Sequence, residues 1–169
     1  ADGRLVREAG HFLSVTVLLG IAGSRDSLAH ARATAEVLNR MRPNQVAALT
    51  LMLLANTPLA RDFREGTFVL PDQRTLLLEL RTLLAHLALE RSQFQANHAS
   101  NYFELDGRLP RDTIEMIAQV DRALAGAVAQ LKQHLALAPG AADAREAQGL
   151  VRPLPTSPAP RRTGRAPPA

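Results

Sequence analysis

Two short apolar runs, separated by one amphipathic stretch, constrain the fold of this chain more than any other feature. The first, "HFLSVTVLLG" at residues 11–20, holds β-branched and aromatic residues and ends in glycine, which predicts a buried strand over roughly 12–19. The second, "QVAALTLMLL" at residues 45–54, has no polar alternation, which is typical of a strand covered on both faces.

The stretch between the two runs predicts a helix that begins with Ser24 as N-cap and ends near Arg42, before Pro43. Its apolar positions share one face: Leu28, Ala31, Ala35 and Leu38. Strand, helix and strand of these lengths predict a right-handed βαβ unit with a parallel sheet. Two strands are too few for a stable sheet, and the only other strand we expect is a short one near Phe94. The chain therefore either associates through this sheet or takes strands from sequence ahead of Ala1.

The rest of the chain predicts two long helices and a tail. Asp72 is the expected N-cap of the first helix, whose core stripe consists of leucines: Leu76, Leu80, Leu83, Leu84 and Leu87. Pro110 is expected at the first position of the second helix, which runs past Gly126 until Pro139. We therefore divide the chain into a βαβ portion (1–68), a helical region (69–138) and a disordered tail rich in proline, arginine and alanine (139–169).

Charge is concentrated in the tail. The 169-residue chain has 20 basic and 16 acidic residues, a formal charge of +4. From Pro139 onward, five arginines against Asp143 and Glu146 give +3, which leaves only +1 for the body, so nucleic-acid binding by the body is not indicated. No apolar run reaches the roughly 20 residues of a membrane helix. No signal-peptide pattern opens the sequence, so the cytoplasm is the expected compartment.

The absence of cysteine excludes disulfides, thiol catalysis and any cysteine-ligated metal or cluster within this chain. His86 and Glu90 have the i, i+4 spacing of a metal pair, but in a leucine-rich helix this spacing is more typical of a solvated face. A metal site in the body is therefore not expected.

Two segments carry candidate binding residues. In "LLGIAGSRD", residues 18–26, Gly20 and Gly23 follow a strand and precede a helix, an arrangement that lets backbone amides approach a ligand but is also that of a plain tight turn. In "NHASNYFELDG", residues 97–107, several polar side chains gather beside the only tyrosine. They either bind a small polar ligand or cap turns, and the residues alone leave both readings open.

The order of these pieces resembles the C-terminal half of radical S-adenosylmethionine (radical SAM) proteins, in the iron-sulfur oxidoreductase-like group. The resemblance rests on "GRLVREAGHFLSVTVLLGIAGS", "LNRMRPNQVAALTLMLLANTPLARDFREGTF" and "NHASNYFELDGRLPRD", and it covers about residues 3–125. It implies an α/β fold, the C-terminal part of a partial (β/α)6 TIM-like barrel, in which the two predicted strands are the fifth and sixth.

The resemblance also implies roles for both segments. In the family, the loop after the fifth strand lies beside the adenosine of S-adenosylmethionine, which makes Leu18, Gly20, Ile21 and Gly23 the expected cofactor neighbours. The second segment is expected to return to the carboxyl end of the barrel and to place Asn97, His98, Asn101 and Tyr102 near substrate or cofactor.

The sequence departs from the family in one decisive respect, because the three cysteines that bind the 4Fe-4S cluster are absent, together with the first four strands. The chain alone is therefore expected to be inactive and to require the N-terminal half of the barrel as a partner, in the same or a separate chain. Two alternatives stay open: a degenerate pseudoenzyme, and a non-catalytic interaction protein whose arginine-rich tail binds a partner or nucleic acid.

Overall fold

The computed structural model describes residues 3–101 and 103–137, with Arg4 and residues 128–137 described through their backbone alone. This part of the chain is an α/β protein with four strands and five helices. Along the chain they are α1 (Gly3–Glu8), β1 (Ser14–Leu19), α2 (Gly23–Met41), β2 (Gln45–Thr50), α3 (Pro58–Arg64), α4 (Gln73–His86), β3 (Ser92–Gln95), β4 (Asp106–Leu109) and α5 (Thr113–Leu137).

The four strands form one open mixed sheet in the order β1-β2-β3-β4. The first three strands are parallel, and β4 runs antiparallel to β3, with Phe94 opposite Gly107. The predicted βαβ unit and the strand near Phe94 are therefore confirmed. The sequence did not predict β4, because "DGRL" is short and holds a glycine and two charged residues; its pairing with β3 makes it a strand.

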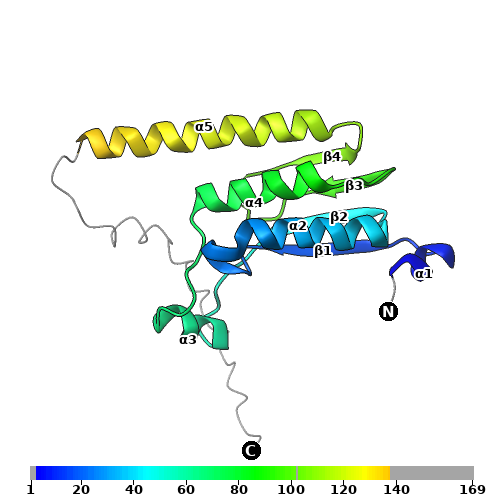
Figure 1. Ribbon diagram of the computed structural model, residues 1–169, viewed down its shortest axis with the longest axis horizontal. Helices are drawn as coiled ribbons and strands as arrows, with labels where there is room; N and C mark the ends of the chain where they lie inside the picture. Colours follow the sequence, from blue (N-terminus) through cyan, green and yellow to red (C-terminus); the bar gives the residue numbers. More distant parts are fainter. Residues whose placement is uncertain (1–2, 102, 138–169) are drawn as a thin grey trace, which may run out of the picture. The chain divides into compact units, whose positions relative to one another are not determined.

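Helices α2, α4 and α5 lie side by side on one face of the sheet (Figure 1). The core lies between these layers, where Leu38 of α2 and Leu84 of α4 meet Val46 and Phe94 of the strands; each of these four side chains is at most 1% exposed. Burial of one such side chain stabilises the fold by about 1.5–3 kcal/mol. The helix layer and the sheet therefore hold each other in place.

The other face of the sheet is not covered by any helix of the described residues. Burial alternates along β2, where Val46 and Ala48 are buried but Gln45, Ala47 and Leu49 are only partly buried. Among the described residues, this strand is therefore covered on one face, and the predicted cover on its second face is not found there. Polar side chains line part of the uncovered face, since Gln45 donates to Gln95, and Gln95 Nε2 donates to Asp106 Oδ2 at 2.9 Å.

The starts of two helices differ from the sequence prediction. Helix α2 begins at Gly23 without a side-chain cap, because the hydroxyl of Ser24, the expected N-cap, donates instead to the carbonyls of Val69 and Leu70. Leu28, expected on the buried face of α2, is 38% exposed.

Helix α5 begins three residues after Pro110, because the residues that follow β4 form a turn in which the Asp112 carboxylate accepts the Arg108 amide at 2.8 Å. In α4, the predicted cap is confirmed: Asp72 Oδ1 accepts the Thr75 amide at 2.7 Å.

The predicted portions 1–68 and 69–138 share one sheet, because β2 of the first pairs with β3 of the second. The predicted tail at 139–169 lies outside the described residues. Within the described ranges, no helix combines the length and the apolar character that a membrane crossing requires.

Candidate functional site

The carboxyl ends of the parallel strands meet at one edge of the sheet, and both segments singled out in the sequence lie there. Strand β1 leads into the turn at residues 20–23, and β3 leads into residues 97–101, with the end of β2 between them. A small cavity at this edge is lined by Leu19, Thr50 and Asn101, among others, and a second one by Gly20 and again Thr50. Thr50 therefore lies between the two segments.

The 97–101 segment is fastened to the end of β2. The hydroxyl of Thr50 donates to Asn101 Oδ1 at 3.0 Å, and Asn101 Nδ2 donates to the Ala48 carbonyl at 2.8 Å. The Thr50 amide, in turn, donates to Ser100 Oγ at 3.3 Å. Both ends of the Asn101 side chain are therefore engaged by the strand, so Asn101 anchors the segment.

His98 and Asn97 are exposed at the same edge. His98 Nδ1 accepts the Ser100 amide at 3.1 Å and lies 2.9 Å from the Ser100 hydroxyl. Because Nδ1 is an acceptor, the neutral ring carries its proton on Nε2. His98 thus presents an N–H group to the solvent. Tyr102, the fourth predicted residue of this segment, lies outside the described residues.

The turn after β1 already uses several of its amides. Gly20 and Gly23 have positive φ angles of 86° and 70°. The Gly23 amide donates to the Gly20 carbonyl at 3.1 Å, the Ser24 amide donates to Val69 O at 2.9 Å, and the Gly20 amide donates to Glu79 Oε2 at 3.1 Å. Any ligand would therefore have to meet the remaining part of the turn, around the 39% exposed Ile21.

Leu18, the other residue predicted to neighbour the cofactor, lies on the uncovered face of the sheet. It is partly buried and opposite Leu49 of β2 in the parallel register. Together, Leu18 and Leu49 place an apolar surface just below the turn at residues 20–23, on the side that no described helix covers.

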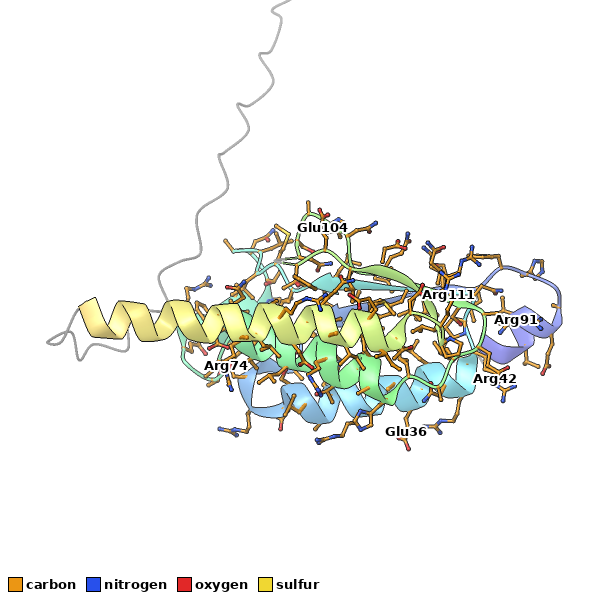
Figure 2. All side chains as sticks on the ribbon, turned by 90° about the horizontal axis from the view of Figure 1, so that it is seen from above. Glu36, Arg42, Arg74, Arg91, Glu104 and Arg111 are labelled. Atoms are coloured by element: carbon orange, nitrogen blue, oxygen red, sulfur yellow. The ribbon has the colours of Figure 1, made fainter. Side chains whose placement is uncertain are left out.

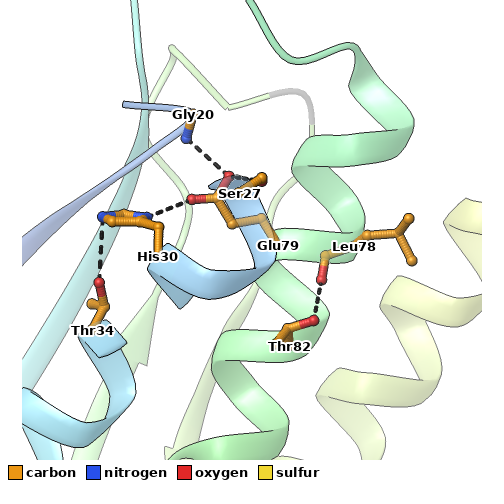
Figure 3. A network of polar contacts seen from close by, with 7 residues as sticks. All are labelled: Gly20, Ser27, His30, Thr34, Leu78, Glu79 and Thr82. Carbon is orange, nitrogen blue, oxygen red and sulfur yellow. Dashed lines mark hydrogen bonds and ion pairs between the residues drawn. The ribbon is translucent and has the colours of Figure 1, made fainter. Parts of the chain in front are cut away.

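A buried polar network supports the turn from the helix layer (Figure 3). Glu79 of α4 is completely buried, and its Oε2 accepts both the Gly20 amide and the Ser27 hydroxyl, the latter at 2.5 Å. Its Oε1 lies 2.8 Å from Nδ1 of His30, whose Nε2 is 3.3 Å from the Thr34 hydroxyl. The carboxylate thus joins α4, α2 and the end of β1.

The sequence did not single out Glu79, although it holds a signal that could have done so. Glu79 lies three residues after Leu76 and four before Leu83, within the stripe of α4 that faces the core. On α2, Ser27 and His30 follow the same helical spacing. A lone acidic residue in one apolar stripe, with a hydroxyl and an imidazole on the neighbouring helix, indicates a buried hydrogen-bonded group.

The cavities of this edge are too small for a cofactor. Each has a volume of about 20 Å³. That is enough for roughly one water molecule, whereas pockets for small molecules have roughly 300–1,000 Å³. The described residues can therefore form one wall of a ligand site, but not an enclosed pocket.

No cluster of metal-ligating side chains exists among the described residues. His86 is exposed, with Nδ1 2.8 Å from the Thr82 carbonyl, and Glu90 lies after the end of α4. Since the chain also lacks cysteine, the described residues do not fit an iron-sulfur cluster.

The charged side chains with clear pKa shifts lie away from this edge. Hydrogen bonds from the Arg111 side chain and the Arg108 amide lower the pKa of Asp112 to about 2. The Arg81 side chain joins α4 to α5 through a hydrogen bond to Asp121, which lowers the pKa of Asp121. Figure 2 shows Arg111 at the end of the unit that also carries Arg42 and Arg91, where β2 and β3 begin.

A scan against models of protein families finds no match to this chain, and neither curated proteins nor solved structures show a similarity to it. The fold and the site alone define the class of this protein. It is an α/β protein with an open, mainly parallel sheet and a polar edge at the carboxyl ends of its strands. The resemblance to radical SAM proteins stays a prediction.

Proposed function

We propose that this chain supplies the C-terminal part of a radical SAM barrel of the iron-sulfur oxidoreductase-like group. In this role it forms one wall of the pocket for S-adenosylmethionine and substrate. The observation that carries the proposal is the meeting of the 20–23 turn and the 97–101 segment at the carboxyl edge of a parallel sheet, because ligands of parallel α/β folds bind at that edge.

The one-sided sheet supports the barrel. Open parallel sheets normally carry helices on both faces, whereas in a barrel the helices lie outside and the inner face meets other strands. Here α2, α4 and α5 cover a single face, and among the described strands β1 has only one neighbour. Further strands would continue the sheet from β1 and enclose the face that carries Leu18 and Leu49.

Exposed apolar side chains at the carboxyl edge support a second wall. They lie on the loops that leave this edge and on α3: Ile21, Met52, Leu54, Phe63 and Val69. Apolar groups that gather at one edge indicate a surface that another part of a protein covers. With cavities of about 20 Å³, a pocket of cofactor size would need that second wall.

The cofactors divide between the two halves in this proposal. The 4Fe-4S cluster does not fit this chain, so its cysteines would belong to the N-terminal half. S-adenosylmethionine would meet this half at the exposed Ile21, since Gly20 and Gly23 are buried and their amides are already bonded, while His98 and Asn97 would face the substrate. Because both ends of the Asn101 side chain bond to β2, its part would be to position the segment.

The test is whether a polypeptide with a C-x3-C-x2-C motif completes the sheet. We expect it in frame ahead of the codon for Ala1, or as a separate chain that purifies with this one. In the assembled protein, His98→Ala should lower turnover while the melting temperature stays unchanged, because His98 is exposed. If neither source yields such a polypeptide, the proposal is wrong.

A non-catalytic interaction protein is the second candidate, favoured by the same exposed apolar side chains. In that case the carboxyl edge receives another protein, and the arginine-rich tail adds electrostatic affinity. Binding that weakens strongly with salt and disappears when residues 139–169 are deleted would favour this candidate over the barrel.

A further inference from the structure

Glu79 is the one charged side chain that is buried in the described part of the chain. Its neighbours along the buried stripe of α4 are leucines, among them Leu76 and Leu83. A buried charge is unfavourable unless hydrogen bonds compensate for its lost hydration, and a whole buried polar cluster can often be replaced by apolar side chains of similar size at no cost in stability. Packing alone therefore does not explain a glutamate at this position.

The contacts of Glu79 point to the turn after β1. Its Oε2 accepts from the Gly20 amide at 3.1 Å and from the Ser27 hydroxyl at 2.5 Å. Its Oε1 lies 2.8 Å from His30 Nδ1. Since a carboxylate only accepts hydrogen bonds, His30 carries a proton on Nδ1. Two partners come from α2, and the third is the backbone of the turn (Figure 3).

The turn needs such support because glycine restricts its own backbone very little. Gly20 has a φ angle of 86°, and the Gly23 amide closes the turn onto the Gly20 carbonyl at 3.1 Å. The hydrogen bond from the Gly20 amide to Glu79 selects one orientation of this flexible residue. The direction in which Ile21 and Ala22 leave the strand follows from that orientation.

We propose that Glu79 is a positioning residue that fixes the 20–23 turn through the Gly20 amide. It thereby sets the geometry of the carboxyl edge of the sheet, where the cofactor would bind. The inference rests on the proposed function for the role of the turn. The hydrogen bond itself does not depend on that function. His30 and Ser27 hold the carboxylate from α2, so the orientation of the turn is tied to the packing of α2 against α4.

The network predicts different effects for two replacements. Glu79→Gln retains an oxygen that can accept from Gly20 and Ser27, while its NH2 group faces His30 Nδ1, so the His30 proton should move to Nε2, toward Thr34. Glu79→Leu removes the acceptor altogether. Leu83→Ala, in the same buried stripe of α4, serves as the control that disturbs packing without touching the turn.

The experiment is NMR spectroscopy of the isotope-labelled 169-residue chain. In the wild type, we expect a coupling across the hydrogen bond between the Gly20 amide nitrogen and the Glu79 carboxyl carbon, together with slow exchange of the Gly20 amide. Exchange should be much faster in Glu79→Leu and close to wild type in Glu79→Gln, in which His30 should show the Nε2–H tautomer. Leu83→Ala should leave the Gly20 signal in place.

Three results would overturn the inference. They are an absent coupling with fast Gly20 exchange in the wild type, a Gly20 amide that does not respond to Glu79→Leu, and an equal response to Leu83→Ala. The wild-type coupling decides the matter even if Glu79→Leu does not fold.

S-adenosylmethionine binding to the assembled barrel, measured by equilibrium dialysis, separates this inference from the proposed function. We expect Glu79→Leu to weaken binding on the order of 10-fold, as is usual when a group that orients ligand contacts is lost, and Glu79→Gln to change it little. A wild-type protein that does not bind the cofactor would refute the proposed function and leave the Gly20 result standing. Equal binding by the wild type and Glu79→Leu would refute the role of Glu79.

Discussion

The two segments at the carboxyl edge of the sheet are held in opposite ways. The 20–23 turn has few side-chain functions of its own, and a carboxylate of the helix layer, Glu79, holds its backbone. The 97–101 segment is rich in polar side chains, and two of them, Ser100 and Asn101, bind it to β2. Thr50, the last residue of β2, bonds to both Ser100 and Asn101.

The contrast between the two segments shows that a polar side chain at a candidate site is not always available to a ligand. In the 97–101 segment, Asn101 is engaged at both ends of its amide, whereas the exposed His98 retains Nε2. The residue that holds the backbone of the turn, Glu79, is not part of the turn and lies 59 positions away from Gly20 in sequence. Replacements of buried supporting residues, each paired with a replacement of an exposed residue, test this contrast between the two segments.

The largest effect is expected for Glu79→Leu. The change leaves the Gly20 amide, the Ser27 hydroxyl and His30 without their buried acceptor, and the loss of one partner from such a group costs about 3 kcal/mol of unfolding free energy. Urea denaturation measures it. A stability equal to wild type would show that the turn does not depend on α4. Glu36→Leu, an exposed change on α2, is the control and should shift stability little.

The next effect is expected for Gly20→Ala. The φ angle of 86° is unfavourable for alanine, and its Cβ would lie 3.0 Å from the Leu76 Cδ2 atom. Together these should lower the unfolding free energy by about 2 kcal/mol. Gly10→Ala is the matched control, because its φ is 82° and, apart from Gly10 itself and its two chain neighbours, no heavy atom lies within 4 Å of the added Cβ. Equal losses in both variants would mean that the Leu76 contact contributes nothing.

In the second segment, Asn101→Ala should cost about 1–2 kcal/mol, because it removes the hydrogen bonds to Ala48 and Thr50 at a partly buried site. Asn97→Ala, an exposed change four residues earlier, should stay within about 0.5 kcal/mol of wild type. Thermal denaturation of both variants measures the contrast. If the two lose equal stability, Asn101 does not anchor the segment.

The smallest effect is expected at a partly exposed carboxylate of the opposite edge, that of Asp112. The Arg111 side chain and the Arg108 amide hold the pKa of Asp112 at about 2, below its usual 3.8. A lowered pKa in the folded state adds stability above about pH 4, and this contribution disappears as the pH falls through about 2. Carboxyl carbon NMR titration should show the low value, and Arg111→Ala should raise it. A pKa near 3.8 in the wild type would contradict this pairing.

The parallel βαβ unit could be predicted from local sequence because apolar runs and capping residues act within a few residues. The N-cap Asp72 and the strand near Phe94 follow this rule. Strand β4 does not, because its short charged sequence becomes a strand only beside β3. Ser24 has the right chemistry for a cap, but the loop that carries Val69 captures its hydroxyl.

For the candidate site, the residue types at the carboxyl ends of the strands could be identified from the sequence: glycines after β1 and a polar cluster after β3. Local patterns suffice for this, since the order of strands and loops is written along the chain. Three features became visible only in the folded protein: the described helices leave one face of the sheet uncovered, Asn101 bonds to β2, and Glu79 holds Gly20. These outcomes depend on contacts between residues about 50 or more positions apart, which only the packing of helices on the sheet creates.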